Sequence, residues 1–248
     1  MKILLSPSKS QDFDSKSNLV NKTSPIFSSE TNKLVSYMHA YTKDDLMKMM
    51  NISERLAELN VDRYTNWAAA KQKQAISAFT GDVYSVFQNN TLSNSTLTYL
   101  EEHIRIISGL YGLLSPLTLI KPYRLEMGRR VFTSADKSNS IRLYDFWGDL
   151  VTSYLTNHDV IINLASNEYC KVIDTSLLKG KFITIVFKTR KNGAMKIIPI
   201  FAKRERGAMA LWMAQNNIKN VEKIKEYNKN GYQFSKADSS ELAWIFVN

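Results

Sequence analysis

Lysines and arginines placed next to chain turns are the residues of this sequence that are best suited to bind a ligand, because together with backbone N–H groups they can hold an anion. The first example is LLSPSKS, Leu4–Ser10, where an apolar run breaks at Ser-Pro and exposes hydroxyls and Lys9. If a helical turn begins there, its free N–H groups and the lysine ammonium would together hold an anion. An ordinary polar turn with a solvated lysine fits the same residues equally well.

A second basic segment is SGLYGLLSPLTLIKPYRLEMG, residues 108–128. Gly109 and Gly112 permit the close approach of another part of the backbone. The cations in or just after this segment are Lys121, Arg124 and Arg129. Because Glu126 stands two residues from Arg124, an internal salt bridge is the alternative to an anion site.

The third basic segment is FAKRERGAMALWM, residues 201–213. Its pattern predicts a helix from about Lys203 to Asn217, which places Lys203, Arg204 and Arg206 in the first turn. The helix dipole disfavours cations there, and such a broken rule is typical of a site that holds an anion. Exposed cations at a helix start cost only about 0.3–1 kcal/mol each, so a chain also tolerates them without a function.

The fourth segment is ISERLAELNVDRYTNW, residues 52–67. We expect two short helices joined by a tight turn at 59–61, because Asn60 tolerates a positive φ. A helix-hairpin-helix of this kind holds a DNA phosphate with backbone N–H groups, and Arg63 would add charge. Any pair of helices joined by a short loop shares this pattern.

Metal and cofactor chemistry has little support in the sequence. His39, His103 and His158 stand about 60 residues apart, and Cys170 is the single cysteine. Without a second ligand at helical spacing, we expect no metal ion and no cofactor. A Cys–His nucleophile pair stays open, since such partners meet in space rather than in sequence. The motifs GxGxxG, Walker A and GxSxG are absent.

The net charge of +10 is unevenly distributed over the 248 residues. Residues 171–248 hold 15 Lys/Arg and 6 Asp/Glu, whereas residues 1–170 hold 18 and 17. A basic third of the chain indicates either a polyanion partner such as nucleic acid or a solubilising charge excess. The sequence has neither an apolar run of membrane-spanning length nor a signal-like start, so we expect a cytoplasmic protein that does not contact membranes.

The coarse element pattern is helix-rich in the first half and strand-rich in the second. It predicts an α+β (mixed α/β) fold in a single compact domain, residues 1–248, with a central mixed sheet flanked by helices. Expected strands are 2–6, 160–165, 182–189, 195–202 and 241–247, with a hairpin turn at Asn192-Gly193. Expected helices are 31–41, one capped by Thr42 and Asp45, one from Ser53 to about Asn60, 71–79, 99–108 and 203–217.

Seven short stretches follow one another in order along nearly the whole chain: ILLSPSKS, GDVYS (81–85), SGLYGLLSPLTLIKPYRLEMG, LYDFWGD (143–149), INLASNEYCK (162–171), AKRERGAM (202–209) and NGYQF (230–234). Together they resemble the YaaA family of bacterial peroxide-stress proteins. The resemblance implies a cytoplasmic protein that limits hydrogen-peroxide damage and is linked to low free intracellular iron. It also implies a family-specific fold with a helix-hairpin-helix, a basic cleft and binding of double-stranded DNA.

Carried over to this chain, the hairpin falls on residues 56–63. The cleft residues are Lys9, Lys121, Arg124, Lys203 and Arg206. One departure is Glu58, which stands where such a hairpin usually has glycine and would repel phosphate.

Two functions therefore compete, and both use the same cations. The first is binding of double-stranded DNA by its phosphate backbone, with little sequence specificity and no catalysis. Its expected contacts are Lys9, Asn60, Arg63, Lys121, Arg124, Lys203, Arg204 and Arg206.

The second function is that of an enzyme acting on a nucleotide or another phosphorylated small molecule, with Ser6, Ser8, Glu126 and Glu168 as added polar groups. A closed, deep pocket near Lys9 would favour the enzyme, and an open surface would favour DNA. A third possibility is an interaction protein that affects iron indirectly.

Overall fold

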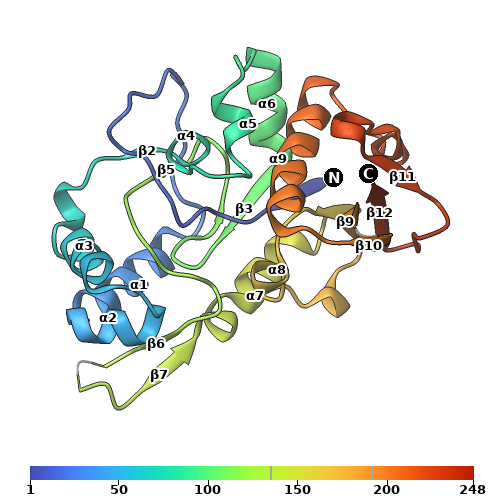
Figure 1. The fold of residues 1–248 in the computed structure, drawn as a ribbon. Coiled ribbons are helices and arrows are strands. Elements are labelled where there is room, and N and C mark those ends of the chain that lie inside the picture. The colour runs from blue at the N-terminus through green and yellow to red at the C-terminus, as the bar shows by residue number, and fades with distance from the viewer. Residues whose placement is uncertain (135, 192) are drawn as a thin grey trace.

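A central sheet runs through the computed structural model, which describes residues 1–134, 136–191 and 193–248 (Figure 1). Within those ranges its order is β11-β12-β9-β8-β1-β3-β4, and β10 pairs with β9. Strands β12, β9, β8, β1 and β3 are mutually parallel, whereas β4, β10 and β11 run antiparallel to their neighbours. The bounds are β1 Lys2–Leu5, β3 Ile104–Ser108, β4 Gly112–Leu114, β8 Val160–Asn163, β9 Lys181–Lys191, β10 Ala194–Lys196, β11 Gln233–Ser235 and β12 Ala243–Val247.

Helices flank this sheet, and α1–α3 gather on the side of the molecule away from α9 and the C-terminal strands (Figure 1). The helix bounds are α1 Ser28–His39, α2 Lys43–Met50, α3 Glu54–Thr65, α4 Ala75–Ala78, α5 Ser85–Gln88, α6 Asn94–His103, α7 Leu143–Leu155, α8 Asn167–Cys170 and α9 Pro199–Gln215. Short 3-10 turns are η1 Trp67–Ala69, η2 Thr175–Leu177, η3 Val221–Glu226 and η4 Lys229–Gly231. Two small ribbons pair β2 Lys73–Gln74 with β5 Leu119–Ile120, and β6 Arg130–Phe132 with β7 Ser140–Arg142. The predicted mixed sheet flanked by helices is confirmed.

Nearly continuous apolar sequences form the inner strands, as expected for strands covered on both faces. The strands predicted at 2–6, 160–165 and 241–247 are confirmed. The helix predicted at 99–108 is wrong beyond His103, because Ile104–Ser108 is the buried strand β3. Its β-branched isoleucines pair with β1, and this tertiary pairing outweighs the helical periodicity.

The helix predicted at 71–79 shrinks to the single turn α4. Residues Lys73 and Gln74 instead pair with Leu119–Ile120. The Gln74 side chain donates to the carbonyls of Leu19 and Asn21, so contacts with distant segments hold this stretch extended.

A helix-hairpin-helix turn at 59–61 is not formed, and that prediction is wrong. Helix α3 runs unbroken from Glu54 to Thr65. Asn60 is buried inside it, with its Nδ2 donating to the Leu56 carbonyl and its Oδ1 accepting from Arg63. The left-handed residue of this region is Asn51 (φ 52°), after α2, where the predicted Thr42–Asp45 capping box is confirmed at the helix start.

The second half of the predicted 195–202 strand is helical. The expected pairing across the turn is confirmed, with Lys191 opposite Ala194, while Asn192 lies outside the described residues. Strand β10 ends at Lys196, and α9 begins at Pro199, a residue whose fixed φ suits the first helical position. Lys203, Arg204 and Arg206 therefore lie beyond the first turn, which corrects the predicted helix start.

Chain topology sets the place where a ligand would bind. From β1 the chain continues to β3 on one side of the sheet, and from β8 it continues to β9 on the other side. In such sheets, ligands bind outside the carboxyl ends of the strands at this switch point. We call the edge where β1, β3, β8, β9 and β12 end the carboxyl edge, and the opposite edge the amino edge.

Helix α9 packs on the sheet and against the turn at 81–84 through a glycine. A Cβ added at Gly207 would lie 2.0 Å from the Val83 carbonyl oxygen, so any side chain there forces the backbones apart. A Cβ added at Gly148 in α7 would lie 3.7 Å from its nearest neighbour, the Val172 carbonyl oxygen, which is an ordinary van der Waals contact.

Gly207→Ala should therefore lower stability by about 1–3 kcal/mol, since overpacking outweighs the gain in helix propensity. For a chain of this size that corresponds to a fall of roughly 2–4 °C in Tm per kcal/mol, measured by thermal unfolding. Gly148→Ala, the matched control, should leave Tm unchanged or raise it. An unchanged Tm in Gly207→Ala would show that α9 does not pack this tightly.

Candidate basic site at the carboxyl edge

The carboxyl ends of β1 and β8 are tied together by two serines. The Ser166 N–H donates to Ser6 Oγ at 2.8 Å, and Ser6 Oγ lies 3.3 Å from Ser166 Oγ. The Leu164 N–H donates to the Leu4 carbonyl just before them. The switch point is therefore closed at its base, and the loop after β1 carries Lys9 outward from it.

Residues 123–128 cross over the carboxyl ends of three strands. The Tyr123 hydroxyl lies 2.7 Å from Ser108 Oγ at the end of β3. A Cβ at Gly109 would lie 2.3 Å from the Leu125 carbonyl oxygen, so glycine is needed for this crossing. At the far end the Gly128 N–H points to Glu168 Oε1 at 3.4 Å, beyond β8. The segment therefore fills the crevice where related topologies hold a ligand.

Glu126 is the centre of the site, with a side chain that is only 2% exposed. Its Oε1 accepts two hydrogen bonds from Arg124, at 3.1 and 3.0 Å, and lies 3.4 Å from Lys9 Nζ. Its Oε2 is 3.8 Å from Arg129 Nε and has no hydrogen-bond partner within the described ranges. The anion that Lys9 and Arg124 hold is thus the Glu126 carboxylate. Arg124 and Glu126 form the internal salt bridge that the sequence offered as the alternative to an anion site.

The turn at 81–84 joins the Lys9 loop to α9. A Cβ at Gly81 would lie 3.2 Å from Ser8 Oγ, and the Tyr84 hydroxyl donates to the Ser6 carbonyl at 2.7 Å. On its other side, Asp82 Oδ1 lies 3.3 Å from Arg204 Nε. Asp82 was not among the predicted site residues, although it stands in the GDVYS motif.

Glu205 anchors the basic turn of α9 by pointing into the protein. It accepts hydrogen bonds of 2.6 Å from both the Tyr227 hydroxyl and Asn230 Nδ2. Burial of this carboxyl raises its pKa. Because Glu205 faces inward, the cations around it in the RER sequence are held toward the carboxyl edge.

Arg206 is half-buried, and its Nε is fully buried without a hydrogen-bond partner in the described chain. Burial lowers the pKa of its guanidinium. The guanidinium lies close enough to Cys170 to favour the thiolate, yet burial dominates and raises the pKa of this thiol. The site therefore combines an arginine whose Nε has no partner with a cysteine that stays protonated at neutral pH.

The structure brings some predicted residues together and separates others. Lys9 and Arg124 meet at Glu126, and the turn at 81–84 connects them to Lys203, Arg204 and Arg206. Arg63 flanks the group, because its neighbour Tyr64 donates to the Arg124 carbonyl. Burial, with a smaller contribution from the charge of Arg124, lowers the pKa of the Arg63 guanidinium.

Lys121 and Asn60 are placed elsewhere. Lys121 Nζ donates to the carbonyls of Trp67 and Ala68 and lies 5.4 Å from the centre of the Trp67 ring. It lines a separate hollow of about 250 Å³. Asn60 is enclosed in α3 and presents no group to the carboxyl edge.

Little internal space remains beside Lys9 and Arg124. The cavity there, lined also by Pro7, Gln11 and Tyr169, has a volume of about 10 Å³. That is about one water molecule, far below the roughly 300–1,000 Å³ of small-molecule sites. Ser6 already accepts from Ser166, and Glu168 contacts Gly128. An anion must therefore approach this site from outside.

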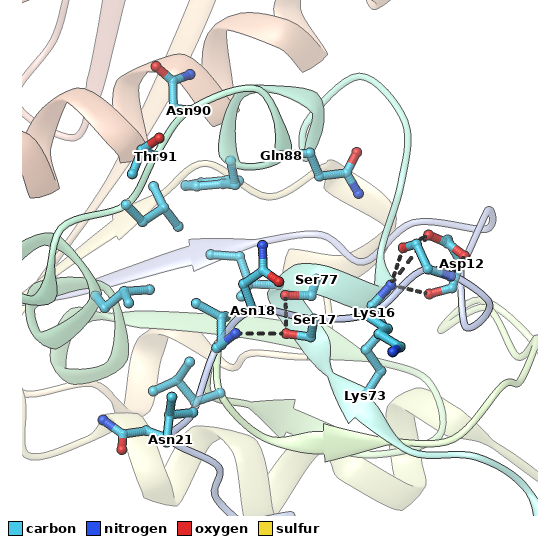
Figure 2. A pocket seen from close by; sticks show the side chains of 18 of the residues that line it. Asp12, Lys16, Ser17, Asn18, Asn21, Lys73, Ser77, Gln88, Asn90 and Thr91 are labelled. Atoms are coloured by element: carbon cyan, nitrogen blue, oxygen red, sulfur yellow. Dashed lines mark hydrogen bonds and ion pairs between the residues drawn. The ribbon is translucent and has the colours of Figure 1, made fainter.

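A larger cavity of about 740 Å³ lies on the other side of the 78–80 segment, under the loop at 12–21 (Figure 2). At one end, Lys73 is buried and its Nζ donates to the Asp12 carbonyl at 3.0 Å and to Ser15 Oγ at 2.8 Å. Asn18 and Asn90 line the space from two segments (Figure 2). The sequence interpretation missed this cavity, although the polar run QNNTLSN at 88–94 was a visible signal.

Neither a metal centre nor a membrane-spanning helix is found in the described part of the chain. It holds no group of three or more His, Cys, Asp or Glu side chains placed to bind a metal ion. Its helices are all too short or too polar to cross a bilayer.

Comparison with known proteins places this arrangement in a family. The family model described as peroxide stress protein YaaA matches residues 1–238. The chain belongs to the YaaA family. A UPF0246 protein of Cupriavidus metallidurans is 41% identical over 260 residues, which cover 99% of this chain and 98% of the relative. UPF0246 proteins of Acaryochloris marina (40% over 254 residues; 99% of each chain) and Shewanella sediminis (38% over 256 residues; 99% and 98%) are similar.

YaaA membership supports a role in peroxide stress, and the fold brings the seven motifs of this chain together. Six of them meet at the carboxyl edge. Among these, LYDFWGD contributes two hydrogen bonds: the Trp147 indole N–H donates to the Gly109 carbonyl, and the Tyr144 hydroxyl donates to the Glu168 carbonyl. The seventh, NGYQF, supplies Asn230 to hold Glu205. The family motifs thus build one site and its support.

Glu126→Gln should lower stability by about 1.5–3 kcal/mol, since Arg124 then donates to a neutral acceptor and both Arg124 and Lys9 lose their buried counter-charge. Sulfate should raise the Tm of this variant more than that of the unmodified chain at matched ionic strength, because an anion can replace the carboxylate. Glu205→Gln is the control, since its partners are neutral, and it should show the unmodified chain's sulfate response. Equal sulfate shifts in both variants would contradict an anion site at Glu126.

Proposed function

We propose that this YaaA family member is a cytoplasmic peroxide-stress protein that binds double-stranded DNA by its phosphate backbone and has no catalysis of its own. The observation that carries the proposal is the buried, unpartnered Nε of Arg206 at the carboxyl edge. Buried donors are almost always satisfied, so the unpartnered Nε of this guanidinium supports an anion that arrives from outside.

The surroundings of Arg206 favour a polyanion. Lys203 is exposed, and the side chains of Arg204 and Lys9 are 56% and 58% exposed. All lie on α9 or on the loop after β1, at the carboxyl edge. Exposed cations spread over one edge are suited to successive phosphates, and such contacts carry no sequence information.

The competing enzyme function requires a substrate pocket in the same cluster of cations. The small space beside Lys9 and Arg124 does not fit a nucleotide, and Glu126 occupies the position of its phosphate. Among the described residues, the carboxyl edge therefore favours DNA binding over this alternative.

Lys203→Ala/Arg206→Ala should reduce the slope of log K against log salt for duplex DNA by up to about 2 units, one for each lost phosphate contact. The measurement is a fluorescence-anisotropy titration of one duplex at several salt concentrations. Lys219→Ala/Lys223→Ala is the control with the same charge change, placed after α9 and in η3 at the amino edge, and it should keep the original slope. A salt-independent affinity of the unmodified chain would contradict phosphate binding.

We also propose that the protein is linked to lowering free intracellular iron, which follows from the family resemblance rather than from the site. Cells that lack the protein should contain more chelatable iron under peroxide, read by whole-cell electron paramagnetic resonance. If the link runs through DNA binding, Lys203→Ala/Arg206→Ala should fail to restore the lower level, whereas Lys219→Ala/Lys223→Ala should restore it. Equal iron with and without the protein would contradict the link.

A further inference from the structure

The end of β9 and all of β10 form a ribbon at the end of the main sheet; we call residues 188–191 and 193–196 the basic arm. Pairing of β9 with β8 ends at Thr184, and pairing with β12 ends at Lys188. Beyond that point the Arg190 N–H still donates to the Asn248 carbonyl at 2.8 Å, and the ladder partner is β10, with Arg190 opposite Met195 and Lys196 opposite Thr189. Since β9 is parallel to β1 and β8, the basic arm projects from the carboxyl edge, beside the start of α9 (Figure 1).

The basic arm lies in the most one-sided charge run of the chain. Residues 175–204 contain eight Lys/Arg and no Asp/Glu. Four of these cations are in the arm, and no ion pair involves them within the described ranges. They are Lys188, Arg190, Lys191 and Lys196.

These cations occupy both faces of the ribbon. Side chains alternate along a strand, so Lys188 and Arg190 share one face, with Lys191 on the other. Lys196 sits opposite Thr189 and therefore shares the face of Lys191; at the base of this face the Thr189 hydroxyl lies 2.6 Å from the Tyr232 hydroxyl. A two-stranded ribbon fits the major groove of duplex DNA, whose walls are phosphate backbones on both sides. Cations on both faces match that environment.

An exposed apolar group lies where the arm leads into α9. The side chains of Ile197, Ile200 and Phe201 are 54%, 43% and 44% exposed. A second copy of this chain would bring the same cations face to face, which disfavours self-association. Deoxyribose and the edges of bases offer apolar surface together with negative charge, so nucleic acid satisfies both features at once.

We propose that the basic arm lies in the major groove of duplex DNA, with its two faces contacting phosphates of both strands and Phe201 packing on sugars or base edges at its foot. This inference rests on the proposed DNA-binding function and identifies a contact element that is separate from the Arg206 site. The arm extends the contact surface along the carboxyl edge.

The test compares charge removal with apolar removal. Arg190→Ala/Lys191→Ala/Lys196→Ala should lower the slope of log K against log salt by up to about 2.7 units, since each phosphate contact contributes about 0.9. Lys179→Ala/Lys219→Ala/Lys223→Ala removes the same charge at the amino edge and should leave the slope unchanged. Phe201→Ser should weaken binding severalfold with the slope unchanged, because no counterion is released at an apolar contact.

The outcomes separate this inference from the proposed function. If the unmodified chain binds duplex DNA and Lys203→Ala/Arg206→Ala lowers the slope, an arm variant with the original slope overturns the arm proposal alone. If the unmodified chain does not bind duplex DNA, both proposals fail. A monomer–dimer shift in Phe201→Ser, seen by light scattering, would assign the apolar group to self-association and overturn its role here.

Lys196→Glu, a single exposed change, provides a second variant should the triple variant fold poorly, and it should also lower the slope of log K against log salt.

Discussion

The buried carboxylate of Glu126 is the interaction on which the arrangement of this protein depends. A charge that is 2% exposed requires counter-charges, and it receives them from Lys9, Arg124 and Arg129. These contacts fix the loop after β1 and the segment that crosses β3 and β8. The switch point of the sheet is thereby closed by the protein's own carboxylate, and the free cations are left on its outer surface.

Because the crevice at the switch point is closed, this protein cannot hold a nucleotide there, as its sheet topology would suggest. A parallel sheet with a switch point commonly holds a nucleotide in that crevice. In this chain, residues 123–128 occupy the crevice, and Gly109 allows them to cross within contact of β3. What remains for binding is an edge made of α9, the Lys9 loop and the basic arm. Such a surface suits an extended polyanion better than a small molecule.

The sequence predicted the parts whose signals are local. The strands at 2–6, 160–165 and 241–247, the capping box at Thr42 and the pairing across the β9–β10 turn follow from residue patterns within a few positions. The predictions at 71–79, 99–108 and 59–61 failed because distant partners decided the structure. Ile104–Ser108 is a strand because β1 lies beside it, and Asn60 stays helical because its amide donates to the Leu56 carbonyl. For the site, the basic motifs were visible in the sequence, but the direction of Glu205, the separation of Lys121 and the neutralisation by Glu126 depend on tertiary packing.

The central claim is that the carboxyl edge is the surface that binds DNA. Lysine acetylation footprinting, read by mass spectrometry with and without duplex DNA, tests it most directly. The account predicts protection of Lys9, Lys196 and Lys203, with Lys219 and Lys223 at the amino edge modified equally in both states. Protection confined to the amino edge, or to Lys16 at the 740 Å³ cavity, would contradict it.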